Sequence, residues 1–183
     1  MEKLRFRRME AGDLPLLHEW LRRPHVQRWW RDRDTYEEVV EHYLPSIEGD
    51  DPTDLYFALL DGKPIGFVQT YLVSDYPEYA ALVGVGEGVA GVDLFVGDAR
   101  LTGQGIGSEI LRRFVDEVVF AVPTTTSCVA DPDAKNVASL RAFEKAGFVV
   151  VKEFVDPEDG QVHALVRRDR ADSWGHQGSE PGG

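Results

Sequence analysis

A glycine-rich turn between an apolar strand and an amphipathic helix is the feature that most restricts how this chain can fold. The turn reads Thr102-Gly-Gln-Gly-Ile-Gly-Ser108 and follows the apolar run 92–96. Glycines adopt backbone angles that other residues resist, and without a Cβ they let backbone N–H groups approach an anion closely. The pattern predicts an α/β protein with an anion-binding turn at a helix N-terminus. A purely structural turn is the alternative.

Two common phosphate-binding motifs do not fit this turn. It lacks the Lys-Ser/Thr ending of a P-loop, and it falls in the middle of the chain, without the early strand and downstream acidic residue of a dinucleotide-binding fold. A third kind of phosphate cradle, made of oriented backbone amides, remains.

The rest of the chain alternates between predicted strands and helices. Asp13 is placed to cap the first helix, and segment 74–90, rich in glycine and acidic residues, is interpreted as a long loop. The pattern predicts one domain over residues 1–168 and a disordered polar tail over residues 169–183. We expect strands at 3–7, 55–60, 65–72, 92–96, 124–130, 148–154 and 161–166, and helices at 14–21, 35–47, from 103 onward and at 136–146.

The formal net charge of −12 restricts the partners of the chain. A strongly acidic protein repels nucleic acid and suits a cationic ligand, although acidity can also serve solubility alone. Between Lys63 and Arg100 the chain has five acidic residues and no basic one. A cleft lined by this segment would be electronegative.

Two further features exclude classes of protein. The N-terminus is charged and no apolar stretch is long enough to span a bilayer, so we expect a cytoplasmic protein with no membrane partner. The single cysteine, Cys128, lies in an apolar run, which excludes an intrachain disulfide and a thiolate zinc site and favours a core position. We expect no metal.

The blocks around the glycine-rich turn resemble the GNAT superfamily of N-acetyltransferases. Its most specific mark is Asn136-Val-Ala-Ser139 followed by Ala142-Phe-Glu-Lys-Ala-Gly-Phe148. The resemblance implies a mixed, mostly antiparallel sheet of six to seven strands, splayed between strands four and five and flanked by about four helices. It also implies acetyl-CoA as cosubstrate, held by Leu94, Phe95, Val96, Thr102, Gly103, Gln104, Gly105, Ile106, Gly107, Ser108, Asn136, Ser139 and Phe143.

A second set of motifs resembles the aminoglycoside 6′-N-acetyltransferases, from about Leu4 to Arg168. The resemblance implies an enzyme that transfers the acetyl group of acetyl-CoA directly to the 6′-amine of an aminoglycoside in a ternary complex. Such an activity is associated with antibiotic resistance, but the sequence does not reveal whether resistance is the natural role. The motifs are Glu19-Trp-Leu21, Trp29-Trp30, His42-Tyr-Leu-Pro-Ser46, Gly62-Lys-Pro-Ile-Gly66, Gln69-Thr-Tyr71, Gly91-Val-Asp93 and Ala130-Asp-Pro132.

Asp93 is the catalytic base that this resemblance implies. An ammonium group cannot attack a thioester, so the reaction needs a proton acceptor beside the amine. Asp93 also interrupts an apolar strand, where an unpartnered carboxylate would be costly to bury. The alternative is a structural aspartate bonded to backbone amides.

The resemblance further implies a substrate site of acidic and aromatic residues. Acids would bind ammonium groups, and aromatic rings would form a wall against the sugars. Turn or cap roles are the alternatives for Asp131 and Asp159, and core packing is the alternative for the tryptophans. Because two adjacent tryptophans cannot share one helix face, at least one should lie at a surface or cleft. The implied residues are Trp30, Tyr43, Gln69, Glu78, Asp93, Asp131 and Asp159, with Asp51 a weaker candidate.

The chain departs from the family pattern at two positions. Thr102 replaces an arginine or glutamine, which matters little if amides bind the phosphate. Phe143 stands where the family commonly has a tyrosine that protonates the leaving thiolate, so we expect a rate lower by about ten- to a hundredfold.

Two other functions remain open at this point. One is acetylation of a different amine, such as a polyamine, a siderophore precursor or a peptide N-terminus, which would not need Asp131 and Asp159. The other is a non-catalytic acyl-CoA-binding module. The sequence does not distinguish a monomer from a homodimer, nor does it indicate which aminoglycosides are accepted.

Overall fold

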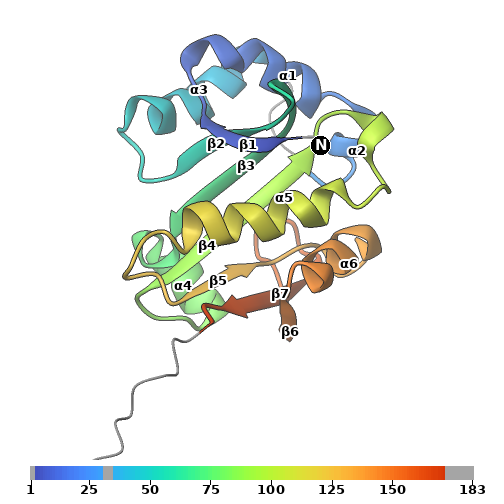
Figure 1. Ribbon diagram of the computed structural model, residues 1–183. Helices are drawn as coiled ribbons and strands as arrows, with labels where there is room; N and C mark the ends of the chain where they lie inside the picture. Colours follow the sequence, from blue (N-terminus) through green and yellow to red (C-terminus); the bar gives the residue numbers. More distant parts are fainter. Residues whose placement is uncertain (1–2, 31–34, 172–183) are drawn as a thin grey trace, which may run out of the picture.

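The computed structural model describes residues 3–30 and 35–171, and its centre is one seven-stranded sheet (Figure 1). The strand order is β1-β2-β3-β4-β5-β7-β6, and every neighbouring pair is antiparallel except β4 and β5. This confirms the predicted mixed, mostly antiparallel fold. The strands are β1 (Leu4–Arg8), β2 (Asp54–Leu60), β3 (Lys63–Leu72), β4 (Val89–Val96), β5 (Ser127–Ala130), β6 (Val149–Val155) and β7 (Val162–Asp169).

The parallel pair β4–β5 is short, and this opens the sheet. The two strands pair only from Val89 to Gly91 of β4, opposite Ser127 to Val129 of β5. Beyond Gly91, β4 continues to Val96 paired only with β3. The predicted splay between strands four and five is therefore present.

Helices cover both faces of the sheet, and the described residues form six of them. The prediction of about four missed two short helices, α2 and α4. The helices are α1 (Leu14–Leu21), α2 (Pro24–Gln27), α3 (Tyr36–Glu48), α4 (Pro77–Val83), α5 (Ile106–Phe114), which continues into a π-helical turn at Val115–Val119, and α6 (Val137–Lys145).

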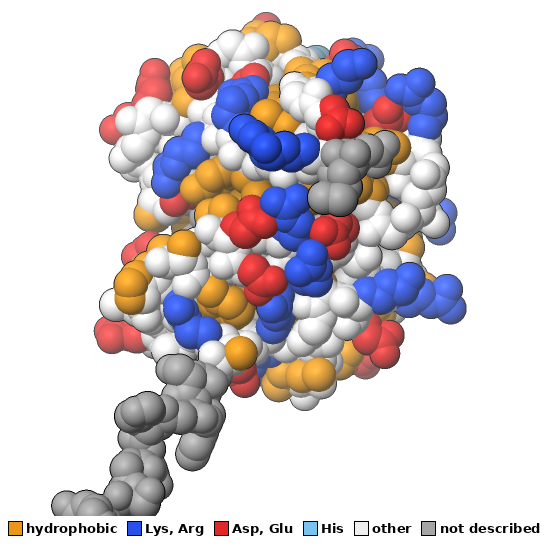
Figure 2. Space-filling model, viewed as in Figure 1, with side chains coloured by type: hydrophobic (Ala, Val, Ile, Leu, Met, Phe, Trp, Pro, Cys, Tyr) orange, Lys and Arg blue, Asp and Glu red, His pale blue; other side chains and the backbone are white. Residues whose placement is uncertain are grey.

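Of the three apolar cores that the described residues form, the two larger lie on opposite sides of the sheet. One joins α1 and α3 to β2 and β3, with Leu17, Val39 and Phe57 fully buried. The other joins α5 and α6 to the central strands and includes Phe114 and Cys128, so the predicted core position of the cysteine is confirmed. The outer face of α5 carries intermixed acidic and basic side chains (Figure 2), including Arg112–Glu109 and Arg113–Glu117 pairs.

The interpretation of segment 74–90 as a loop is wrong in its first half. α4 begins with Pro77, whose fixed φ suits a first helical position, and ends at Val83, followed by the C-cap Gly84 with φ of +73°. Its Tyr79, Ala80 and Val83 pack against β5 and β7. The segment was interpreted as a loop because it is rich in glycine and acidic residues and because the helix has only about two turns.

Two other expectations also need correction. Asp13 does not cap α1, because its carboxylate accepts from the Glu10 N–H at 2.8 Å and pairs with Arg7 at 2.9 Å. β7 extends to Asp169, three residues past the predicted end of that strand at Val166, and Arg170 donates to Thr125 O at 2.8 Å. The rest of the predicted tail, residues 172–183, lies outside the described residues.

None of the helices in the described segments combines the length and the apolar character that crossing a bilayer requires.

Candidate active site

A cleft of about 660 Å³ opens where β4 and β5 separate. β4 and the end of β5 border it, together with the turn before α5, the start of α6 and the β6–β7 hairpin. Most of the predicted site residues line this cleft: Trp30, Asp93, Leu94, Phe95, Val96, Thr102, Gly103, Gly105, Ile106, Gly107, Ser108, Asp131, Asn136, Ser139, Phe143 and Asp159.

The glycine-rich turn has the conformation that its sequence requires. Gly103 and Gly105 have φ of +74° and +84°, in the left-handed region that side chains resist. Gly105 is also the N-cap of α5 and offers no side-chain cap. The first-turn amides of α5 have no acceptors within the helix, so they remain free for an anion in the cleft.

Polar side chains of the turn stabilise it through hydrogen bonds to nearby backbone oxygens. Thr102 Oγ1 donates to Ala99 O at 2.7 Å, Gln104 Nε2 to Arg100 O at 2.5 Å, and Ser108 Oγ to Gly105 O at 2.8 Å. Of the predicted turn residues, only Gln104 does not border the cleft. The turn therefore exposes its backbone to the cleft, while its polar side chains form hydrogen bonds that stabilise the turn itself.

α6 forms the wall opposite β4. Its N-cap is Asn136, whose Oδ1 accepts from the Ser139 N–H at 3.1 Å. Phe143 is 4% exposed and packs edge-on against Phe148, with ring centroids 5.1 Å apart. Arg141 adds a positive charge to the lining of this wall.

Asp93 borders the cleft from β4. Gln69 stands directly opposite on β3, and its Nε2 donates to Asp93 Oδ2 at 2.9 Å. Burial, together with the nearby charge of Asp131, raises the pKa of Asp93 to about 6, against the hydrogen bond from Gln69 that lowers it. Near neutral pH the carboxylate is ionised and can accept a proton.

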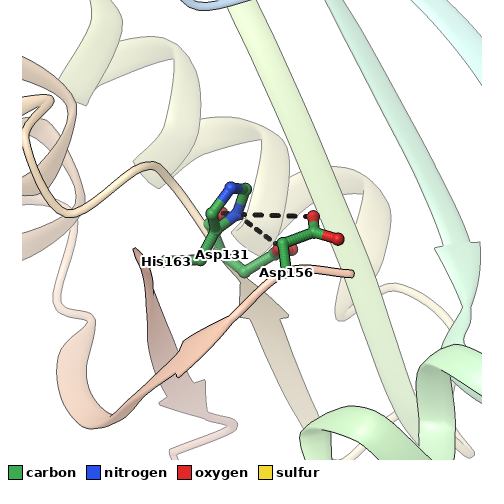
Figure 3. A group of neighbouring side chains, drawn as sticks. All are labelled: Asp131, Asp156 and His163. Atoms are coloured by element: carbon green, nitrogen blue, oxygen red, sulfur yellow. Dashed lines mark hydrogen bonds and ion pairs between the residues drawn. The ribbon is translucent and has the colours of Figure 1, made fainter. Parts of the chain in front are cut away.

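A cluster of carboxylates around His163 forms the end of the cleft near β5 and the β6–β7 hairpin (Figure 3). His163 Nδ1 lies 3.0 Å from Asp131 Oδ2 and 3.8 Å from Asp156 Oδ2, and Nε2 lies 3.0 Å from Asp159 Oδ2. Tyr79 Oη donates to Asp131 Oδ1 at 2.6 Å. This end is therefore acidic, with one basic ring inside it.

The hydrogen bonds of the three acids bear on the structural alternatives left open for them. Asp131 is not a turn cap, because Asp133 accepts from the Lys135 N–H at 2.8 Å in that place. Asp159 does accept from the Gln161 N–H at 2.8 Å, as a hairpin turn residue, while its other oxygen faces His163. Among the described residues, the hydrogen-bond donor to Asp93 is the Gln69 side chain and not a backbone amide.

The two adjacent tryptophans differ in their surroundings. Trp29 is 36% exposed at the cleft, which confirms that one of the pair lies at a surface. Trp30 also borders the cleft but packs edge-on against Phe95 and Phe67. Its Nε1 donates to Tyr43 Oη at 3.3 Å.

Four predicted substrate residues lie outside the cleft lining. Tyr43 is 2% exposed, in the core behind Trp30, and Gln69 contacts Asp93. Glu78 is exposed on α4. Asp51 accepts from the Thr53 N–H at 2.9 Å and from the Ser46 and Tyr76 hydroxyls, so it stabilises the loop after α3.

The sequence interpretation missed His163 and Tyr79. Tyr79 was missed because it lies in segment 74–90, which was interpreted as a loop. His163 follows Asp159 by four residues in a hairpin, and its contact with Asp131 depends on the β5–β7 pairing. The only local signal was a histidine inside the apolar start of β7, Val162-His-Ala-Leu-Val166.

Comparisons with known proteins agree with this geometry. The model of the acetyltransferase (GNAT) domain matches residues 10–156. Aminoglycoside N(6')-acetyltransferase type 1 of Klebsiella pneumoniae is 32% identical over 170 residues, 91% of this chain and 84% of that protein.

Solved structures with bound ligands resemble the fold over almost its whole length. Aminoglycoside acetyltransferase AAC(6')-Ib with coenzyme A and kanamycin has a TM-score of 0.76 at 31% identity, over 92% of this chain and 95% of that one. Its complex with ribostamycin and coenzyme A has a TM-score of 0.78 at 30% identity, over 92% and 94%. The chain therefore belongs to the GNAT acetyltransferase family, and within that family it is similar to the aminoglycoside N(6')-acetyltransferases.

Proposed function

We propose that this protein is an acetyl-CoA-dependent N-acetyltransferase that acetylates the 6′-amine of aminoglycoside antibiotics. The observation that carries the proposal is that one cleft joins an anion-binding turn to a cluster of carboxylates, with Asp93 between them. A cleft with two oppositely charged ends suits an anionic acetyl donor and a polycationic acceptor. Because acetyl-CoA is made inside the cell, the proposed reaction implies a cytoplasmic enzyme.

The residues at the turn fit the acetyl-CoA that the family implies. The amides of 103–108 would hold its pyrophosphate at the N-terminus of α5, where the helix dipole favours negative charge. The edge of β4 from Leu94 to Val96, which β5 leaves unpaired, would hold the pantetheine arm. When bound, the cosubstrate supplies a thioester carbonyl that an amine can attack.

The acidic end would hold the acceptor. Asp131 and Asp159 would accept hydrogen bonds from ammonium groups that do not react. Asp93 would take the proton of the reacting ammonium on Oδ1, because Oδ2 already accepts from Gln69. A pKa of about 6 leaves Asp93 ionised at neutral pH and still basic enough to share that proton.

Phe143 supplies apolar surface at the position where a proton donor would otherwise protonate the leaving thiolate. A phenylalanine cannot donate, so protonation of the thiolate would fall to water, at a cost of about ten- to a hundredfold in rate. The ring, almost fully buried, would still exclude water from one side of the cleft.

Steady-state release of the CoA thiol tests the proposal with kanamycin, spermidine and an N-terminal peptide as acceptors. We expect turnover with kanamycin, acetyl on its 6′-nitrogen by NMR, and loss of turnover in Asp93→Asn. Asp50→Asn, an exposed carboxylate outside the cleft, is the matched control.

Two other outcomes would indicate a different function for this protein. Turnover with spermidine or peptide alone would indicate an acetyltransferase for another amine. Binding of acetyl-CoA without turnover on any acceptor would indicate a non-catalytic module.

A further inference from the structure

Both ring nitrogens of His163 face atoms that can only accept hydrogen bonds. Nδ1 lies 2.7 Å from the backbone oxygen of Asp131 and 3.0 Å from its Oδ2, and Nε2 lies 3.0 Å from Asp159 Oδ2. A carbonyl or an ionised carboxylate cannot donate, so each nitrogen must carry a proton to make a bond. The geometry therefore requires an imidazolium.

The surroundings of the ring stabilise this charge. The side chain of His163 is 13% exposed, and those of Asp131, Asp156 and Asp159 are 16%, 18% and 30% exposed. Hydrogen bonds to Asp131 first, and then to Asp159, raise the pKa of His163 to about 9, although burial alone would lower it. The other groups nearby are the ring of Phe154, the backbone of Asp133 and the hydroxyl of Tyr79 on Asp131.

The two carboxylates that face the cleft do not depend on His163 for their orientation. Asp131 Oδ1 accepts from Tyr79 Oη at 2.6 Å, and Asp159 Oδ1 accepts from the Gln161 N–H at 2.8 Å. What His163 adds to them is mainly its positive charge. That charge lies within hydrogen-bond distance of both carboxylates and repels any further cation brought to them.

We propose that His163 is a specificity-determining residue: a cation built into the acceptor end of the cleft, which limits how many ammonium groups an acceptor can place against Asp131 and Asp159. The inference rests on the proposed function in that those two acids bind the acceptor. It predicts that the protein discriminates against the more highly charged of two otherwise similar acceptors.

The test compares kanamycin A with kanamycin B, in which one hydroxyl of kanamycin A is replaced by an amino group. In His163→Gln, which removes the charge, we expect a lower KM for both acceptors, a fall about three- to tenfold larger for kanamycin B, and little change in kcat. His163→Lys, which keeps the charge, should restore the wild-type ratio of the two KM values. His18→Gln makes the same chemical change on α1, outside the cleft lining, and should change neither value.

Several results would overturn the inference. One is a KM ratio in His163→Gln equal to that of the wild type; another is a rise in both values, which would mean that His163 only orients the acids. A His163→Lys variant that behaves like His163→Gln would also contradict it. A nitrogen-15 NMR spectrum at pH 7.5 that shows a singly protonated His163 ring would do the same.

The inference can be tested even if the proposed function fails. If the wild type acetylates no aminoglycoside, calorimetry with putrescine, spermidine and spermine provides a series of increasing charge. We then expect the affinity gained in His163→Gln to grow along the series, with thermal unfolding curves confirming that the variant is folded. Equal gains along the series, or no binding to either protein, would overturn it.

Discussion

Replacing Asp93 by asparagine should abolish activity and stabilise the fold at the same time. The pKa of Asp93 is about 6, compared with an ordinary value of 3.8, so its ionisation is unfavourable in the folded protein. This difference corresponds to a cost of about 3 kcal/mol. Because the cleft admits some solvent to Asp93, we expect screening to reduce the gain in Asp93→Asn to about 1 to 2 kcal/mol.

The pH dependence of this gain follows from the direction of the pKa difference. Between the unfolded and folded pKa values, the folded protein retains a proton that the unfolded chain has lost, so wild-type stability falls as the pH rises from about 4 to about 6. Asparagine has no such proton, and its oxygen can still accept from Gln69. The variant should therefore gain most above about pH 6.5 and little near pH 4.

Urea denaturation of both proteins at several pH values between 4 and 8, followed by tryptophan fluorescence, measures this difference. CoA release in the same buffers should fall by about a hundredfold or more in the variant. Asp50→Asn, which removes an exposed carboxylate, should show neither effect. A stability difference that does not change with pH, or a variant less stable than wild type at pH 7.5, would refute the account of a strained, ionised base.

Other substitutions test separate parts of the cleft. Gln69→Met removes the hydrogen bond that favours the ionised Asp93, so the acidic midpoint of kcat/KM should rise by about one pH unit. Asp131→Asn removes a like charge and should lower the same midpoint; shifts in one direction for both would contradict this. Gly105→Ala forces a side chain into a left-handed φ of +84° and should weaken acetyl-CoA binding, measured by calorimetry, by about tenfold. Phe143→Tyr should raise kcat by up to about tenfold, and an unchanged kcat would mean that a hydroxyl there cannot reach the thiolate.

Local patterns predicted the parts of the fold whose contacts lie close in sequence. The hairpin of β2 and β3 follows from the two apolar runs, 55–60 and 65–72, that flank the turn at Asp61-Gly62, where Asp61 has φ of +48° and Gly62 has φ of +82°. The glycine-rich turn was equally readable, since two of its glycines need left-handed angles. α4 was not, because a helix of two turns has too few residues to establish a period and owes its stability to packing against β5 and β7.

The candidate site divides in the same way. Asp93 was recognisable because an acid within an apolar strand needs a reason to be there. Its partner Gln69 was assigned to the substrate instead, because the register between β3 and β4 decides that contact and no local pattern sets it. His163 could not be placed from the sequence, since it meets Asp131 only through the long-range pairing of β5 with β7.

The distribution of charge in the cleft answers a difficulty raised by the composition. A chain of net charge −12 repels an anionic cosubstrate and attracts any cation without selection. In the proposed function, the turn at 103–108 would offset the first effect with backbone dipoles, which contribute no net charge and cannot form ion pairs with the acids nearby. The proposed role of His163 would oppose the second, since its charge would neutralise one of the three carboxylates gathered around it. On this proposal, selectivity for an acceptor would depend on local fields within the cleft, while the overall charge of the protein would affect mainly the rate at which ligands arrive.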